Sequence, residues 1–172
     1  MNGDDSLEYY CGKLSFSFKT FSKNGRVKRL ERHDAVNRID ELHMYTYEKD
    51  GSYSIEVIAQ GAGTIILSKY DKYNKCLEQT FSSVETLHYE YDDSGKLVQI
   101  LYNKGNDKPK EIATVVYNKD GLIDKIIGMG PSAQIQYFKY NSFGLPSEKK
   151  LVKMDENGKK EEQTVFSEYE FR

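Results

Sequence analysis

The chain has 172 residues, a net charge of −2, and 38% hydrophobic beside 30% charged residues. This length fits one domain over residues 1–172. The charge balance argues against nucleic acid as a partner, because proteins that bind phosphate backbones carry a basic surplus. No stretch approaches the roughly 18 apolar residues of a transmembrane helix, so no transmembrane segment is expected. With 14 Tyr and eight Phe, the composition favours strands and is unlike that of disordered chains.

Residues 1–8 are expected to form a flexible N-terminal tail. Beyond them, seven four-residue segments share one pattern. The fourth residue is Gly or Asn, which tolerate a left-handed backbone, and six of the seven begin with Asp, Asn or Ser, whose side chains accept hydrogen bonds from following amides. The pattern predicts type I turns closed by a left-handed residue, a common hairpin connection. The segments are 22–25 (SKNG), 48–51 (EKDG), 71–74 (DKYN), 92–95 (DDSG), 118–121 (NKDG), 141–144 (NSFG) and 155–158 (DENG).

An apolar or aromatic residue precedes every one of these turns, and a mostly polar residue precedes that one. This alternation with a period of two is typical of strands with one drier face. Return strands are expected at 26–30, 53–59, 96–102 and 122–127. The sequence therefore predicts an all-β chain, an antiparallel meander of about seven β-hairpins that forms a curled or rolled sheet.

One segment, 33–41, interrupts the pattern, and it predicts either a short helical turn or a loop. Further loops are expected at 104–109 and 128–132, where Gly and Pro gather. No shift of composition marks a domain boundary.

Rows of tyrosines are the one feature that resembles a site. Rings from neighbouring hairpins can pack against each other across strands. Alternatively, exposed rings can stack on a glycan or contact a protein partner. The candidate ligand-binding residues are Tyr45, Tyr47, Tyr89, Tyr91, Tyr117 and Tyr140.

Other chemistry has little support in the sequence. His33 precedes Asp34, a pair that general-base chemistry can use, but no nucleophile stands in a recognisable context. His43 and His88 lie in strand patterns and lack the spacing of metal ligands. No catalytic residue, metal site or cofactor is therefore assigned. Cys11 and Cys76 are either two thiols or one disulfide.

The segments Tyr89–Leu97 (YEYDDSGKL), Val116–Ile123 (VYNKDGLI) and Lys139–Leu145 (KYNSFGL) resemble the YD-repeat motif of rearrangement-hotspot proteins. That resemblance implies strands of a β-shell which, in the large members, encloses a toxin. The chain is also similar to short secreted proteins and lipoproteins of Bacteroidetes. Its start, Met1–Ser6 (MNGDDS), resembles a mature lipoprotein terminus, which implies a lipid anchor and a periplasmic or surface location.

These observations favour a non-catalytic binding or structural module of the cell envelope. A hydrolase-type enzyme with a site in the irregular segments is the first alternative. A relative of a toxin-encapsulating YD-repeat shell is the second. A deep pocket that gathers His33 with two acids would favour the hydrolase, and a shallow aromatic sheet face would favour binding.

Overall fold

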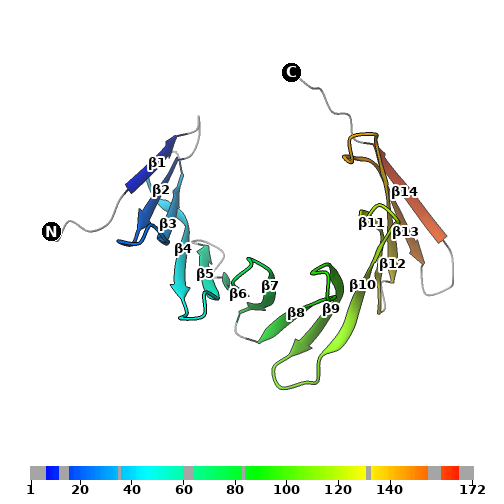
Figure 1. Ribbon diagram of the computed structural model, residues 1–172, viewed down its shortest axis with the longest axis horizontal. Helices are drawn as coiled ribbons and strands as arrows, with labels where there is room; N and C mark the ends of the chain where they lie inside the picture. The colour runs from blue at the N-terminus through cyan, green and yellow to red at the C-terminus, as the bar shows by residue number, and fades with distance from the viewer. Residues whose placement is uncertain are drawn as a thin grey trace. The chain divides into compact units, whose positions relative to one another are not determined.

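The computed structural model describes residues 7–11, 16–34, 36–59, 64–82, 84–130, 133–154 and 160–166. The elements formed by these residues are all β-strands (Figure 1). In chain order they are β1 (Leu7–Cys11), β2 (Phe16–Phe21), β3 (Val27–His33), β4 (Ile39–Tyr47), β5 (Tyr53–Ala59), β6 (Thr64–Tyr70), β7 (Cys76–Phe81), β8 (Glu85–Tyr91), β9 (Leu97–Lys104), β10 (Lys110–Tyr117), β11 (Ile123–Gly128), β12 (Gln134–Tyr140), β13 (Pro146–Met154) and β14 (Lys160–Phe166).

The strand order follows the order of the chain, so the predicted antiparallel meander is confirmed. Each strand pairs with the next in antiparallel register from β1 to β8, and again from β9 to β14. The four return strands expected from the sequence are β3, β5, β9 and β11. The curled or rolled form of the sheet stays a prediction. Of the tail expected over residues 1–8, residues 1–6 lie outside the described residues. The last two positions belong to β1, which begins at Leu7.

The chain divides into two compact units. The first unit comprises Met1–His88 with Asn103–Asp107, and the second comprises Tyr89–Tyr102 with Lys108–Arg172. None of the residues that the structure describes belongs to a helix long and apolar enough to cross a membrane.

The repeated turns have the predicted geometry, as the turn at Asp92 illustrates. The Asp92 amide donates to the Lys96 carbonyl at 2.9 Å, and the Gly95 amide donates back to the Asp92 carbonyl at 2.8 Å. Hydrogen bonds from the Ser94 hydroxyl and the Lys96 amide lower the pKa of the Asp92 carboxyl. Six of the seven predicted left-handed residues have positive φ, and the seventh, Gly158, lies outside the described residues. The six are Gly25, Gly51, Asn74, Gly95, Gly121 and Gly144.

The segment 33–41 holds another copy of this turn between β3 and β4, so of the two expectations the loop is confirmed and the helical turn is wrong. The Asp34 amide donates to the Arg38 carbonyl at 2.9 Å, and the Asn37 amide donates to the Asp34 carbonyl at 3.1 Å. Asn37 has φ of 64°, and Asp34 Oδ1 accepts from the amides of Val36 and Arg38, each at 3.0 Å. Asp34 and Asn37 match the first and fourth residues of the turn at 71–74, and this copy differs from the others in that His33, rather than an apolar or aromatic residue, precedes it.

Few side chains are buried. In the described residues, Val115 and Val152 are the buried apolar ones, and no side chain is less than 2% exposed. Val115 pairs with Ile126 of β11. Val152 pairs with Ile135 of β12, and Ile135 in turn pairs with Ile127, the residue after Ile126. Because adjacent residues of a strand face opposite sides, the two valines lie on opposite faces. Neither face of the second unit is therefore a conventional dry core.

Candidate functional site

The tyrosines that precede two turns of the second unit reach back to the hairpin before them. Tyr117, at the end of β10, donates its phenolic hydrogen to the Leu97 carbonyl at 2.9 Å. Tyr140, at the end of β12, makes the same bond to the Ile123 carbonyl at 2.8 Å. Leu97 and Ile123 each begin the return strand of the preceding hairpin. The same contact therefore recurs in the second unit and ties two of its hairpins to the hairpins before them.

A cation accompanies the tyrosine at equivalent positions in both units. It is the residue directly after the turn glycine, Arg26 in the first unit and Lys96 in the second. The Arg26 guanidinium lies 4.9 Å from the ring centroid of Tyr47, and Lys96 Nζ lies 5.0 Å from that of Tyr117. Both are within the range of cation–π attraction. Burial raises the pKa of the Tyr117 phenol, and the charge of Asp92 raises it further.

Tyrosines from three neighbouring strands of the first unit stack on one another. Tyr47 on β4 is in register with Tyr53 on β5, and Tyr53 is in register with Tyr70 on β6. The ring centroids are 5.5 Å apart in the first pair and 4.9 Å apart in the second, whose planes differ by 8°. Such ring pairs contribute about 0.5–1.5 kcal/mol each beyond area burial. Tyr47, Tyr53 and Tyr70 are called the tyrosine ladder, and Tyr45 lies beside it on the same face.

The ladder uses its ring faces for packing. Tyr53 has a tyrosine on either side. Arg26 lies against the Tyr47 ring. It approaches from the side opposite to Tyr53, because β3 and β5 border β4 on its two sides. Burial raises the pKa values of Tyr45, Tyr47 and Tyr53, whose side chains are half-buried. This packing leaves the ring edges and hydroxyl groups of the ladder to a ligand, and the Tyr70 hydroxyl also forms a hydrogen bond with the Cys76 thiol.

The remaining candidates, Tyr89 and Tyr91, are half-buried and lie two positions apart on β8. Sequence reasoning missed Tyr53 and Tyr70 as members of a site. The signal for Tyr53 was available, because a five-residue turn places the residues on its two flanks opposite each other.

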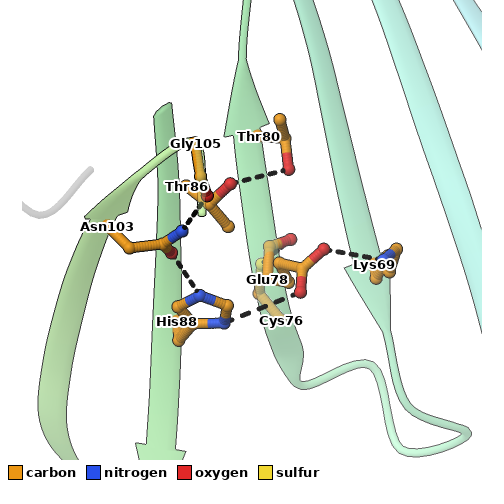
Figure 2. A network of polar contacts seen from close by, with 8 residues as sticks. All are labelled: Lys69, Cys76, Glu78, Thr80, Thr86, His88, Asn103 and Gly105. Carbon is orange, nitrogen blue, oxygen red and sulfur yellow. Dashed lines mark hydrogen bonds and ion pairs between the residues drawn. The ribbon is translucent and has the colours of Figure 1, made fainter. Parts of the chain in front are cut away.

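A row of polar side chains crosses the first unit (Figure 2). Lys69 Nζ lies 2.7 Å from Glu78 Oε1, and Glu78 Oε2 lies 3.6 Å from His88 Nδ1. His88 Nε2 lies 2.7 Å from Asn103 Oδ1, and Asn103 Nδ2 donates to the Gly105 carbonyl at 2.9 Å. The side-chain amide nitrogen of Asn103 faces the Gly105 carbonyl, so its amide oxygen faces His88. In this arrangement His88 donates from Nε2. The row thus links β6, β7, β8 and β9.

Two further contacts accompany this row. The hydroxyls of Thr80 and Thr86 lie 3.3 Å apart, and the Cys76 thiol donates to the Glu78 carbonyl at 3.6 Å. Burial raises the pKa of the Cys76 thiol, which makes it a poorer nucleophile. The sequence left open whether Cys76 pairs with Cys11, and the side chain of Cys11 lies outside the described part of the chain.

The other two histidines each contact a glutamate two positions away. His33 Nε2 lies 2.9 Å from Glu31 Oε2, and the buried His33 ring packs edge-on against Phe18 at 5.3 Å. His43 Nε2 lies 3.0 Å from Glu41 Oε2. Glu31 is the acid that the structure places at His33, whereas the hydrolase alternative required two. Within the described ranges, no three His, Cys, Asp or Glu side chains gather as a metal ion would require.

The second unit has a shallow hollow of about 380 Å³ on one face of β12, β13 and β14. Its lining combines an aromatic side chain, a buried aliphatic one and several charged ones. They are Tyr137, Lys139, Glu148, Lys150, Val152 and Lys160.

Comparisons with known proteins place the chain in no family. No protein-family model matches it, and no curated protein matches it either. Among solved structures, a porin-like protein from Bacteroides uniformis is 12% identical, and the match covers 92% of this chain and 91% of that protein with a TM-score of 0.36. A likeness at this score establishes no shared function.

Proposed function

We propose that the chain is a non-catalytic binding module of the cell envelope, and that the tyrosine ladder contacts its ligand. The observation that carries the proposal is the stacking of Tyr47, Tyr53 and Tyr70 across three strands. The rings hold one another in place, so little side-chain entropy is lost when a ligand binds to their edges.

The ligand that suits the ladder is an extended glycan. A phenolic hydroxyl both donates and accepts hydrogen bonds, and the ladder supplies one hydroxyl on each of three adjacent strands. A polymer that lies across the strands meets these hydroxyls in succession. The ring faces are occupied by packing, so the contact is through hydrogen bonds to ring edges rather than through sugars stacked on rings.

One feature of the sequence supports a place in the cell envelope. The repeated turn, with its preceding tyrosine, resembles the YD repeat of exported proteins. In this proposal the chain is exported and presents the ladder to envelope polysaccharide.

The test is a binding measurement with Tyr→Phe variants, which keep the stacking and remove the hydroxyls. Purified protein is titrated with solubilised peptidoglycan, lipopolysaccharide and neutral β-linked glucan. Tyr53→Phe with Tyr70→Phe should weaken the binding of one of these glycans about tenfold, since each lost hydrogen bond is worth about 0.5–1.5 kcal/mol.

Tyr117→Phe and Tyr140→Phe are the matched controls, because their hydroxyls donate to backbone carbonyls. They should lower thermal stability and leave glycan affinity unchanged. The proposal fails if none of the glycans binds, or if the ladder double variant binds as tightly as the wild type.

A further inference from the structure

The hollow in the second unit combines aromatic, aliphatic and charged side chains, whereas the tyrosine ladder consists of tyrosines alone. Tyr137 forms one wall and is 38% exposed, while Val152 is 6% exposed and lies at the base. Tyr137 is in register with Lys150 on the neighbouring strand, and Val152 is in register with Glu162 on β14. An accessible ring beside a small apolar floor, bordered by charges, is a common composition for small-molecule sites.

The charges around the hollow do not cancel. Lys139 Nζ lies 2.8 Å from Glu148 Oε2, so these two form a simple pair. Glu162 forms ion pairs with two lysines: its Oε2 lies 2.8 Å from Lys150 Nζ, and its Oε1 lies 2.6 Å from Lys160 Nζ. Bonds from both ammonium groups hold the pKa of the Glu162 carboxyl at about 2. Among the described residues that line the hollow and their ion-pair partners, three ammonium groups therefore face two carboxylates, and one positive charge is left for a ligand.

We propose that this hollow binds a monosaccharide-sized ligand that carries one carboxylate, a uronic acid being the simplest example. The ligand ring packs against Tyr137 and the base at Val152. Its carboxylate joins Lys150 and Lys160, where it shares the two ammonium groups with Glu162. A volume of about 380 Å³ is at the small end of ligand pockets, which suits one sugar ring rather than a long oligosaccharide.

This site goes beyond the function proposed above, since it lies in the second unit, uses none of the ladder residues and requires an acidic ligand. Because Glu162 occupies the two ammonium groups in the absence of a ligand, it competes with an incoming carboxylate. Removal of the Glu162 charge should therefore strengthen binding, which distinguishes this site from one that the glutamate helps to build.

The experiment is a proton–nitrogen NMR titration of the whole chain with methyl glucuronide, methyl glucoside and acetate at equal concentrations. The glucuronide should shift amide signals of Tyr137, Lys150 and Val152, and the effect should weaken as salt is added. The glucoside lacks the carboxylate and acetate lacks the ring, so each should bind at least about tenfold more weakly, by the loss of one charge-assisted bond or of the ring contact.

Variants on the two faces of the same strands provide the controls. Lys150→Ala and Tyr137→Ala should each weaken glucuronide binding about five- to tenfold, and Glu162→Gln should tighten it by a similar factor. Lys149→Ala and Glu161→Gln make the same charge changes on the opposite face and should leave the affinity unchanged.

The inference is wrong if the glucuronide causes no shift, if acetate binds equally well, or if Glu162→Gln weakens binding. It is also wrong if the variants on the two faces behave alike. The ladder variant Tyr53→Phe should leave the glucuronide titration unchanged. Failure at the hollow therefore leaves the proposal for the ladder standing, and failure at the ladder leaves the hollow standing.

Discussion

Tyr117 donates its hydroxyl to the main-chain carbonyl of Leu97 at 2.9 Å, across 20 positions of sequence. The same bond joins Tyr140 to Ile123 across 17 positions. In each case the tyrosine stands just before a turn and the carbonyl stands just after the preceding turn. In both cases the bond fastens a hairpin of the second unit to the hairpin before it, in a chain whose described residues include few buried side chains.

The Tyr117 hydroxyl should therefore contribute to stability. Tyr117→Phe removes one partly buried hydrogen bond and should lower the free energy of unfolding by about 0.5–1.5 kcal/mol. Tyr117→Ala also removes the ring and its contact with Lys96, so the loss should be larger. Urea denaturation followed by circular dichroism measures both. Tyr73→Ala is the control, because Tyr73 is 69% exposed at a turn tip. Equal losses for Tyr73→Ala and Tyr117→Ala would contradict the role of the bond.

Two substitutions at left-handed turn positions should differ in their effect on the free energy of unfolding. Gly25 has φ of 76° with no heavy atom within 4 Å of an added Cβ, so Gly25→Ala introduces backbone strain without a clash. It should cost about 1–2 kcal/mol. Asn37 has φ of 64°, and Asn37→Gly should be close to neutral, because glycine adopts this conformation without strain. Thermal unfolding measures both. A stable Gly25→Ala variant would be inconsistent with the turn geometry.

The turns were readable from the sequence because their chemistry is local. Asp92 and Gly95 supply the acceptor and the left-handed residue within four positions, and no distant contact is needed to recognise them. The same local rule also covers Asp34 and Asn37, which differ from the predicted turns only in following His33 rather than an apolar or aromatic residue. Strand identity and sequential pairing follow from turns at these intervals.

The candidate site was less predictable, because side-chain contacts depend on register between strands. The stacking of Tyr53 on Tyr70 requires knowledge of the β5–β6 register, and the sequence between those strands, QGAG, lacks the Asp, Asn or Ser that begins most of the predicted turns. The row from Lys69 to Asn103 likewise draws on four strands. Sequence reasoning chose tyrosines by their position before a turn and so could not separate those that stack from those that bond to the backbone.

Glu41 should make stability depend on acid pH. A hydrogen bond from His43 and the nearby charge of Arg32 lower the pKa of the Glu41 carboxyl below its ordinary value of 4.5. A carboxyl with a lowered pKa in the folded state stabilises the protein above its unfolded pKa, and that stabilisation is lost as the pH falls through the folded pKa. The wild type should therefore lose stability below pH 4.5, and Glu41→Gln should lose less over the same range.

The measurement is the denaturation midpoint at a series of pH values from neutral to strongly acidic. Asp40→Asn is the control, because it removes a neighbouring carboxylate and leaves the pair of Glu41 and His43 intact. The denaturation midpoint of this variant should depend on pH in the same way as that of the wild type. Identical acid limbs for wild type and Glu41→Gln would show that the contact with His43 carries no pH-dependent stability.

The bond between His88 and Asn103 should be measurable as a coupling energy. Asn103→Ala removes the acceptor for His88 Nε2 and the donor to the Gly105 carbonyl, and His88→Ala removes the ring. If the row in Figure 2 acts as a connected network, the double variant should lose less stability than the sum of the two single variants. The expected difference is about 0.5–1.5 kcal/mol, the worth of one such hydrogen bond. Asn106→Ala, at an exposed loop position, should be close to neutral. Strictly additive losses in the cycle would mean that the two residues act independently and that the polar row is not a structural unit.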